Sequence, residues 1–549
     1  MLKIIPLGGL GEIGLNMMLF EYENSIFIID AGLMFPEDYM IGVDIVIPKM
    51  DYIEQNKSKI AAIVLTHGHE DHIGAIPYLL KRVNVPIFAT PFTLGLIRHK
   101  LSEHQILNTA ELYEIDINEE LKIGPFKLEF VRVSHSVIDG VGIAIHTPVG
   151  LIVHTGDFKI NHRFLNNKET DINKFAELGK KGVLALLSDS TNVEKEGYTI
   201  SRQEIADKLE DIIKKTTGRV IVALFASNIN RIAAIVEIAE KYGRKTVFNG
   251  FSLETSVSIA KELGYINISE DAEITVDEID NYPQDKVIII TTGSQGEPMS
   301  SLARMSAGIH KQVKITTGDT IILSSKFIPG NERAITKIIS NLYRRGADVI
   351  YEKISEIHVS GHAFKEELRL MISLVKPKYF IPIHGEYRHL VLHSKLAKDM
   401  GIARDCILLA ENGQVIEFDN NEGKLTEKIA TGRVLIDGKG VGDVGSSVLR
   451  ERRILSEDGF VIVTMALDEE TGIIIYGPEI FSKGFVFPMK TGYLLEDAQC
   501  VILEIVEEIN YGVENRIQKL QEKLKRALRQ YFVYTIKRRP AIYPFIIEV

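Results

Sequence analysis

A dense group of metal-binding side chains stands in the run His67-Gly-His69-Glu-Asp71-His72. Imidazole nitrogens and carboxylate oxygens are the donors that a divalent cation such as Zn²⁺ prefers. The apolar run before it predicts a strand that delivers these side chains to a loop at its carboxyl end. Their spacing directs His67 and His69 toward one ion and Asp71 and His72 toward a second. A solvated turn rarely collects so many ligands, so the sequence predicts a metal enzyme.

Further ligands are expected at other strand ends, because two ions need about seven or eight protein ligands if each keeps a water position. Three expected strands lead to His135, Asp157 and His384. A carboxylate such as Asp157 can bridge two cations, which an imidazole cannot. Four other histidines lack such a placement and are expected to be ordinary core or surface residues: His104, His146, His154 and His162.

The first part of the chain, to about residue 195, predicts a layered α/β fold with sites at strand ends. Loops carry function while the strands fix its position. The strand that leads to Ser188-Asp189-Ser190 follows this pattern. The expected strands lie at 25–30, 62–66, 87–89, 128–133, 142–147, 151–155 and 183–188.

Between about 200 and 365 the pattern changes to apolar strands that alternate with helices, which predicts a parallel, doubly wound sheet. Strands are expected at 220–225, 245–248, 287–291, 320–323 and 348–352, with helices at 229–242, 254–263 and 332–345. Polar turns at 226–228, 292–297 and 324–326 suit a phosphate, because N–H groups at a helix N-terminus favour an anion. Taken alone, each turn is better explained by ordinary capping.

The run Gly9-Leu-Gly11-Glu-Ile-Gly14 matches the pattern of a dinucleotide-binding loop, but its context argues against that function. Such a loop needs a helix directly after the glycines to hold the pyrophosphate. Here two strands with a short turn are expected over residues 16–30. We therefore interpret the glycines as a tight loop between strands.

Length and composition indicate a globular protein of about three domains, with 549 residues, 45% hydrophobic and 25% charged. Cys406 and Cys500 are too few for a disulfide framework, which fits a reducing cytosol. The N-terminus lacks the pattern of a signal peptide. No apolar run reaches membrane-spanning length.

The charge of the chain is unevenly distributed. A net charge of −10 argues against sequence-blind adhesion to nucleic acid, but not against a local basic channel. Residues 516–539 hold nine Lys and Arg against one acid, Glu522. We interpret this segment as a solvated helix face, with contact to a polyanion or a partner subunit as the alternative. After the glycine-rich connector 437–443, strands are expected at 459–467, 472–476 and 543–548, and helices at 496–510 and 514–531.

Taken together, the motifs resemble a known group of enzymes. The run HGHEDH, then SHS around His135 and TGD ending at Asp157, are similar to the successive metal motifs of the metallo-β-lactamase fold. The inserted block resembles the β-CASP domain of nucleic-acid-processing members, whose motifs match SDSTN, HVSGH and PIHGE here. The stretches FASNINR, TGSQGEPM, IPGNE and RRPAIYPFIIEV are most similar to the bacterial ribonuclease J family. The resemblance covers essentially all of the chain.

The resemblance implies an αββα metallo-β-lactamase sandwich with an inserted, doubly wound β-CASP domain and a small C-terminal α+β domain. The first part of the sandwich would span 1–200, the insertion 201–365 and the completing part 366–425. A linker at 426–455 would lead to the C-terminal domain, 456–549, which the resemblance gives a role in dimer or tetramer formation.

The resemblance also implies the residues of the site. One Zn²⁺ would take His67, His69 and His135, the other Asp71, His72 and His384, with Asp157 as the bridge. Mn²⁺ is the rival metal. His362 would hydrogen-bond the scissile phosphate. Asp189 and Asp157 are expected to be catalytic residues beside it. A structural cation, Ca²⁺, would lie near Gly42, Asp44 and Asp437. The RNA backbone and 5′-phosphate would contact Ser227, Asn228, Ile229, His358, Val359, Ser360, Gly361 and His362.

The implied activity is 5′-to-3′ exoribonuclease and endoribonuclease cleavage in RNA maturation and mRNA decay, including rRNA processing, in the cytoplasm. The expected partners are single-stranded RNA with a 5′-monophosphate, further copies of the chain, a paralogous subunit or other RNA-decay enzymes, and no membrane. A small-molecule ester or lactone hydrolase of the same fold is the first rival, but such a substrate does not need a second domain over the site. The second rival is an inactive RNA-binding scaffold. Such a relative should lose metal ligands, whereas all seven ligand positions are filled in this chain.

Overall fold

The structure is a computed structural model, and it divides into two compact units. Unit 1 comprises Met1–Met34 and Ile47–Arg433, and unit 2 comprises Phe35–Val46 and Val434–Val549. The residues it describes are 1–160, 169–297, 299–325, 331–351, 360–419, 422–438, 440–486, 493–508 and 515–549. The finer division into five segments predicted from the sequence stays a prediction.

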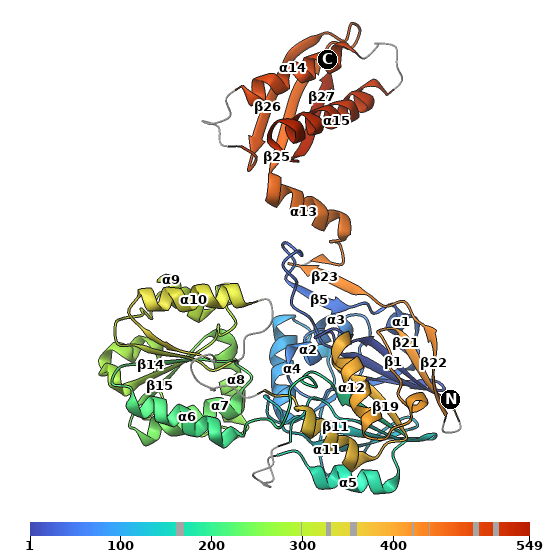
Figure 1. The fold of residues 1–549 in the computed structure, drawn as a ribbon, viewed down its shortest axis with the longest axis vertical. Coiled ribbons are helices and arrows are strands. Elements are labelled where there is room, and N and C mark those ends of the chain that lie inside the picture. The colour runs from blue at the N-terminus through green and yellow to red at the C-terminus, as the bar shows by residue number, and fades with distance from the viewer. Residues whose placement is uncertain are drawn as a thin grey trace. The chain divides into compact units, whose positions relative to one another are not determined.

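Unit 1 contains two sheets that face each other across a shared apolar core (Figure 1). The first has the order β22-β21-β1-β3-β4-β6-β7-β8. Phe20 and Phe27 from this sheet stack at 5.1 Å, and the ring of Phe126 from the second sheet packs edge-on against Phe27. The strands are β22 Glu422–Lys428, β21 Gln414–Asp419, β1 Leu2–Gly8, β3 Met17–Tyr22, β4 Ser25–Ile29, β6 Ile60–Val64, β7 Ile87–Ala89 and β8 Leu112–Glu114.

The second sheet has the order β19-β13-β12-β11-β10-β9 and combines chain segments on both sides of the insertion. Strand β19 pairs in parallel with β13, so that Asp189 is the register partner of Ile383. This pairing places the end of β13 beside the residue that precedes His384. The strands are β19 Tyr379–Ile383, β13 Ala185–Asp189, β12 Gly150–His154, β11 Val141–Thr147, β10 Phe126–Arg132 and β9 Leu121–Ile123.

Helices complete the sandwich on the outside of the two sheets. The outer face of the second sheet packs against α5, α11 and α12 through residues such as Phe175, Met371 and Leu396. This arrangement is the predicted αββα architecture. The helices of this part are α1 Asp51–Gln55, α2 Glu70–Ile73, α3 Ile76–Leu80, α4 Pro91–Glu103, α5 Ile172–Lys181, α11 Lys365–Val375 and α12 Tyr387–Asp399.

The inserted block is a five-stranded parallel sheet of order β15-β16-β14-β17-β18, as its apolar strands predicted. Figure 1 shows α6, α7 and α8 on one face of this sheet and α9 and α10 on the other. The strands are β14 Val220–Ala223, β15 Lys245–Asn249, β16 Val287–Thr291, β17 Thr320–Leu323 and β18 Asp348–Ile350. The helices are α6 Arg202–Lys215, α7 Ile229–Lys241, α8 Phe251–Glu262, α9 Ser301–Ala307 and α10 Glu332–Arg344.

Unit 2 has a three-stranded sheet of order β26-β25-β27 that packs one face on two helices. Its strands are β25 Phe460–Leu467, β26 Ile474–Lys483 and β27 Ala541–Glu548, and its packed helices are α14 Leu494–Glu507 and α15 Arg516–Ile536. Strand β26 is longer than expected. Before them, β23 Arg433–Asp437 pairs with β24 Gly440–Val441, and α13 Ser446–Asp458 forms a helix where the sequence predicted a linker.

The described residues include no helix that is both long and apolar enough to cross a membrane.

Candidate metal centre

The seven predicted ligands converge at one edge of the facing sheets. Four of them lie in the loop after β6 and in α2, and His135, Asp157 and His384 follow β10, β12 and β19. The ligands converge because these strands end on the same side of the sandwich, where the loops that follow them carry the side chains. Most of the cluster is closed to solvent: Asp157 is 3% exposed and His384 4%.

Asp157 is at the centre of this cluster. Its Oδ2 lies 3.7 Å from Nε2 of His67, 3.6 Å from Nε2 of His135, 3.3 Å from Nε2 of His72 and 3.4 Å from Nε2 of His384. One carboxylate oxygen therefore faces four imidazole nitrogens from three separate segments of the chain. This is the arrangement that the bridging role of Asp157 requires.

The seven predicted ligands form two groups of donor atoms, and a further group joins Asp157 and His384 to Asp189 and His362. The first comprises His67, His69, His135 and Asp157, whose donor atoms lie within 4.8 Å of one another. His69 presents Nδ1, which lies 3.1 Å from Nε2 of His67 and 3.1 Å from Nε2 of His135. Ligands in a tetrahedral zinc shell are about 3.3 Å apart when each bond is about 2.0–2.1 Å. The spacing of this group therefore fits one such ion.

The second group comprises Asp71, His72 and His384, whose donor atoms also lie within 4.8 Å of one another. Oδ2 of Asp71 lies 3.6 Å from Nε2 of His72 and 4.0 Å from Nε2 of His384. With Oδ2 of Asp157 this group offers two carboxylates and two imidazoles. Both groups are thus chemically suited to a borderline cation such as zinc.

Burial and mutual charge set the protonation of the cluster. Burial, reinforced by neighbouring imidazoles, holds the pKa of His67 and His135 well below the usual value and lowers the pKa of His69 to about 4. These imidazoles are therefore neutral and keep a lone pair for a metal. Burial alone would raise the pKa of Asp157, but His384 and His72 hold it well below its usual value. Asp157 is thus an ionised acceptor.

His72 behaves differently from the other imidazoles. Burial would lower its pKa, but the carboxylates of Asp157, Asp71 and Asp30 raise it well above the usual value. Without a metal the ring therefore holds an extra proton. A cation that binds Nε2 must displace that proton, which couples metal binding to pH.

Sequence reasoning missed Asp30, which orients His72. Oδ2 of Asp30 accepts a hydrogen bond from Nδ1 of His72 at 2.7 Å, and the N–H and Oγ1–H of Thr66 donate to the same carboxylate at 2.8 Å each. A carboxylate on Nδ1 leaves Nε2 directed at the metal position. Asp30 follows β4, so the strand-end rule that found Asp157 also applied here.

The glycine-rich loop positions another residue that sequence reasoning missed, Asn16. Its Oδ1 accepts a hydrogen bond from Nδ1 of His384 at 2.9 Å, and its Nδ2 donates to the carbonyl of Asp71 at 3.0 Å. A Cβ on Gly9 would lie 2.3 Å from Oδ1 of Asn16, and Gly9 has φ +87°. Only glycine fits there. The loop serves the metal centre, as a tight turn between strands.

Asp189 and His362 lie beside the second group. Oδ2 of Asp189 accepts a hydrogen bond from Nδ1 of His362 at 2.8 Å, and Nδ1 of His362 is 3.8 Å from Oδ2 of Asp157. Burial lowers the pKa of His362, but Asp189 and Asp157 outweigh it and raise it to about 9. His362 is therefore a cation that can donate a hydrogen bond at neutral pH.

The expected RNA-contacting segments are placed only in part. His358 and Val359 lie outside the described residues, as does His162. Oγ of Ser360 accepts from the N–H of His362 at 3.2 Å, and the carbonyl of Gly361 accepts from Nδ1 of His135 at 2.8 Å. The motif thus contacts the first group directly.

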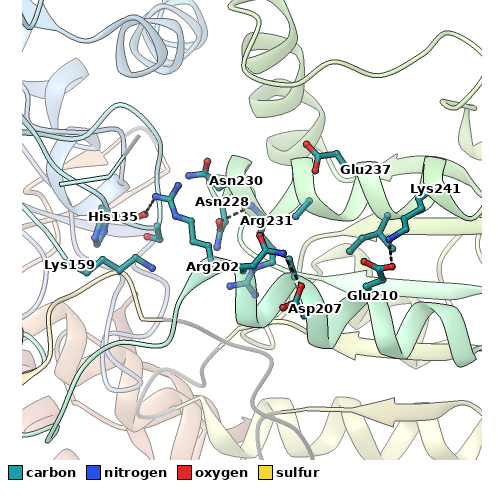
Figure 2. Close-up of a pocket in the computed structure, with 15 residues that line it drawn as sticks. His135, Lys159, Arg202, Asp207, Glu210, Asn228, Asn230, Arg231, Glu237 and Lys241 are labelled. Atoms are coloured by element: carbon teal, nitrogen blue, oxygen red, sulfur yellow. Dashed lines mark hydrogen bonds and ion pairs between the residues drawn. The ribbon is translucent and has the colours of Figure 1, made fainter. Parts of the chain in front are cut away.

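A pocket of about 320 Å³ opens beside His135 (Figure 2). Lys159, Arg202 and Arg231 line it together with Asn228, which caps α7 by accepting from the N–H of Arg231. Ser227 and Ile229, the neighbours of Asn228, are not among the lining residues. Asp207, Glu210, Glu237 and Lys241 also line the pocket, and Figure 2 shows Glu210, Glu237 and Lys241 at the end away from His135. The part of the pocket that suits an anion is therefore the part beside the metal cluster.

Burial of these cations is reflected in their pKa values. Burial and the neighbouring Arg202 lower the pKa of Lys159 to about 7, and burial lowers the pKa of Arg231 to about 10. Nη2 of Arg202 donates to Oγ of Ser134 at 2.8 Å and to the carbonyl of His135 at 3.4 Å. Arg202 therefore connects the inserted block to the loop that carries His135. An anion in the pocket would offset the cost of burying these charges.

The expected structural cation site lies in unit 2, and the side chain of Arg452 contacts the residues of this site. Nη2 of Arg452 pairs with Oδ2 of Asp437 at 2.5 Å, and Nη1 donates to the carbonyl of Ile41 at 3.0 Å. Asp44 accepts from the N–H of Gly438 at 2.7 Å. A Cβ on Gly42 would lie 2.6 Å from Nη1 of Arg452. A guanidinium thus supplies positive charge at this place.

Three of the histidines that were expected to be core or surface residues contact protein groups other than the seven predicted ligands. Nε2 of His146 pairs with Glu129 at 2.5 Å, and Nδ1 of His154 accepts from the N–H of Gly156 at 3.0 Å. His104 packs its ring against Tyr78.

Family models match four segments of the chain. They are the metallo-beta-lactamase superfamily over residues 10–213, the ribonuclease J beta-CASP domain over 217–342, the Zn-dependent metallo-hydrolase RNA specificity domain over 346–408 and the ribonuclease J C-terminal domain over 447–549.

Similarity to individual proteins extends over the full length. Ribonuclease J2 of Bacillus subtilis is 42% identical over 547 residues, which cover 100% of this chain and 98% of the relative. The chain belongs to the ribonuclease J family. Ribonuclease J 1 of Streptococcus pyogenes is also 42% identical, over 99% of this chain and 97% of the relative. The predicted fold class, including the β-CASP insertion and the C-terminal domain, is thereby confirmed for this ribonuclease J family member.

A solved structure shares the fold at low sequence identity. A protein of unknown function from Enterococcus faecalis aligns with a TM-score of 0.53 and 16% identity, over 77% of this chain and 100% of its own.

Proposed function

We propose that the chain hydrolyses single-stranded RNA in the 5′-to-3′ direction, and also internally, with two zinc ions. Membership of the ribonuclease J family supplies the coarser conclusion, that it is a metal-dependent ribonuclease. The observation that carries the finer proposal is Asp157, whose Oδ2 is shared by two groups of donor atoms.

The proposed ligands follow these two groups. His67, His69 and His135 would hold one zinc, and Asp71, His72 and His384 would hold the other, with Asp157 as the shared ligand. When bound, such a pair of cations lowers the pKa of water to about 7 and offsets charge on the attacking and leaving oxygens.

The side chains of the protein orient the substrate around this centre. His362 is held in its charged form by Asp189, so its ring donates a hydrogen bond to a non-bridging oxygen of the scissile phosphate. Asp189 keeps the ring from rotating. In-line attack of water on phosphorus forms a new P–O bond and breaks the bond to the 3′-oxygen, which takes up a proton, so one product carries a 5′-phosphate and the other a 3′-hydroxyl. The 2′-hydroxyl takes no part in the reaction, and preference for RNA must come from contacts along the strand.

The pocket beside His135 supports a preference for a 5′-monophosphate. Lys159, Arg202 and Arg231 line it beside carboxylates that include Glu210 and Glu237, and the volume of about 320 Å³ is at the small end of ligand sites. A monophosphate supplies negative charge that these cations can pair with. A triphosphate is larger, and a 5′-hydroxyl offers no charge, so both should be poorer substrates.

The decisive experiment digests one RNA sequence prepared with a 5′-monophosphate, a 5′-triphosphate or a 5′-hydroxyl. We expect mononucleotides released from the 5′ end, fastest for the monophosphate, and slower internal cuts. Arg202→Gln should weaken the preference among the three ends, and internal cleavage is measured beside it because Arg202 also contacts the loop that carries His135. Equal rates on all three ends in the unmodified enzyme would contradict the assigned pocket, and absence of hydrolysis with added Zn²⁺ or Mn²⁺ would contradict the function.

We also propose that copies of the chain associate through the C-terminal sheet of unit 2. The face of β27 opposite the helices exposes Tyr543, Phe545 and Ile547 at 47%, 65% and 48%. Neighbouring apolar side chains of this kind mark association surfaces. Sedimentation of Phe545→Glu beside the unmodified chain tests this, and an unchanged oligomeric state would exclude this face.

A further inference from the structure

A buried carboxylate with no part in the proposed reaction lies where the chain returns from the inserted domain. Glu367 occupies the first turn of α11 and is 0% exposed. Its Oε1 accepts from the N–H of Ile160 and from Oγ1 of Thr199, each at 2.8 Å. Its Oε2 accepts from the N–H of Thr199 at 3.0 Å and of Phe364 at 2.8 Å. Four donors satisfy a charge whose unpaired burial would cost several kcal/mol.

These donors come from three different segments. Thr199 is in the connection that leads from β13 into the inserted domain, and Phe364 is in the connection that returns from it. Ile160 is three residues after Asp157. One side chain therefore ties both domain connections to the segment that carries the central carboxylate of the metal cluster.

Backbone hydrogen bonds run alongside these contacts. The N–H of Ala363 donates to the carbonyl of Phe158 at 2.7 Å, and the N–H of Lys365 donates to the carbonyl of Lys195 at 2.9 Å. They join the same three segments as Glu367. The N–H of Glu366 also donates to the carbonyl of Gly197 at 3.2 Å. The backbone bonds join the segments in pairs, and the buried carboxylate joins all three at one point.

His362 directly precedes Ala363 and Phe364, which these contacts hold. Nδ1 of His362 lies 3.8 Å from Oδ2 of Asp157, and its partner is Asp189 at 2.8 Å. We infer that Glu367 is a positioning residue that fixes His362 over the metal cluster by joining the two domain connections to the segment after Asp157. This inference rests on the proposed role of His362 in hydrolysis.

The test begins with Glu367→Gln, which keeps the size of the side chain and replaces one acceptor oxygen by a donor. At least one of the N–H groups then faces another donor. We expect a single-turnover rate at least tenfold below that of the unmodified enzyme, with RNA affinity in metal-free buffer within twofold. Hydrogen exchange should quicken in the segments around Ile160 and Phe364 of the metal-free protein. Glu366→Gln, which removes only an ion pair to Arg369 at the surface, is the matched control.

A double-mutant cycle separates positioning from general stabilisation. If Glu367 acts through His362, Glu367→Gln adds no further slowing to His362→Ala. Additive slowing, or an unchanged rate in Glu367→Gln alone, would overturn the inference. If Glu367→Gln does not fold, Thr199→Val removes one donor and should slow the reaction less, with Thr199→Ser restoring the rate. Equal rates for Thr199→Val and the unmodified enzyme would then overturn it.

The proposed function and this inference fail in different ways. An unmodified enzyme that does not cleave RNA contradicts the function, whereas the exchange measurement is independent of cleavage. Unchanged exchange around Ile160 and Phe364 in Glu367→Gln contradicts the positioning role even if the enzyme is an active ribonuclease.

Discussion

Nδ1 of His362 donates a hydrogen bond to Oδ2 of Asp189 at 2.8 Å, across a sequence separation of 173 residues. His362 comes at the end of the inserted domain and Asp189 ends β13 of the sandwich. Asp189 also accepts from the N–H of Thr191 at 2.9 Å and from its hydroxyl at 2.8 Å, which fixes the carboxylate. The pair thus joins the insertion to the metal cluster at the point where a phosphate would lie.

We expect His362→Ala to slow the chemical step by more than tenfold, because one preorganised donor to the phosphate is lost. Single-turnover hydrolysis of 5′-monophosphorylated RNA measures this, with affinity taken separately in metal-free buffer. Asp189→Asn should slow the step in the same way, and the two changes together should not add. His99→Ala, on the surface of α4, is the control. Unchanged single-turnover rates in His362→Ala would show that its role is misassigned.

His69→Ala should abolish hydrolysis and leave RNA binding within about threefold of the unmodified chain. Nδ1 of His69 is one of the donors of the first group, whereas the cations of the pocket contact an anion elsewhere. Elemental analysis should find about one zinc per chain in place of two. Hydrolysis that persists in this variant, or in the unmodified enzyme after complete chelation, would refute the metal assignment.

Asp30→Asn should weaken metal binding by about tenfold to a hundredfold, because the partner that orients His72 is replaced by a group with a donor. Competition with a chromogenic chelator measures the affinity of each site. The affinity of the site that contains His72 should fall, and that of the other site should not change. Asp51→Asn, on the exposed start of α1, leaves the cluster untouched and serves as control. Two equally weakened sites would show that Asp30 acts on the fold of the whole cluster.

Stability should depend on pH through Glu129, away from the metal. Burial raises its pKa, but hydrogen bonds from Lys174 and His146 and the charges of Lys174 and Lys181 outweigh it and lower the pKa to about 2. A depressed folded-state pKa stabilises the protein above the unfolded value of 4.5, and this stabilisation is lost as the pH falls toward 2. The difference in melting temperature between the unmodified chain and Glu129→Gln should therefore shrink from pH 6 to pH 3.

Glu120→Gln provides the comparison for that series. Glu120 pairs with Lys127 at an exposed position, where an ion pair contributes little. Its difference from the unmodified chain should stay small at every pH. A difference for Glu129→Gln that grows on acidification would contradict the assigned pKa direction.

Local patterns were enough to predict many of the strands and the side chains that converge at the candidate metal centre. The strand at Ile87–Ala89 and the strands at Val287–Thr291 and Thr320–Leu323 have the predicted bounds, because apolar runs between turns specify strands without reference to the rest of the chain. The same reasoning led to His135, Asp157 and His384. It did not single out Asp30, although the residue follows a strand in the same way, since a lone carboxylate there has no partner visible in sequence.

The amino-acid sequence by itself determined which side chains can bind metal, because donor type and spacing after a strand are local properties. Only the tertiary structure decided which donors form each group, since parallel pairing of β19 with β13 brings His384 to Asp157 across more than two hundred residues. It also decided the partners of those donors. Asn16 reaches His384, and Glu367 reaches Ile160 and Thr199, through contacts that exist once the sheets are packed and the insertion has returned.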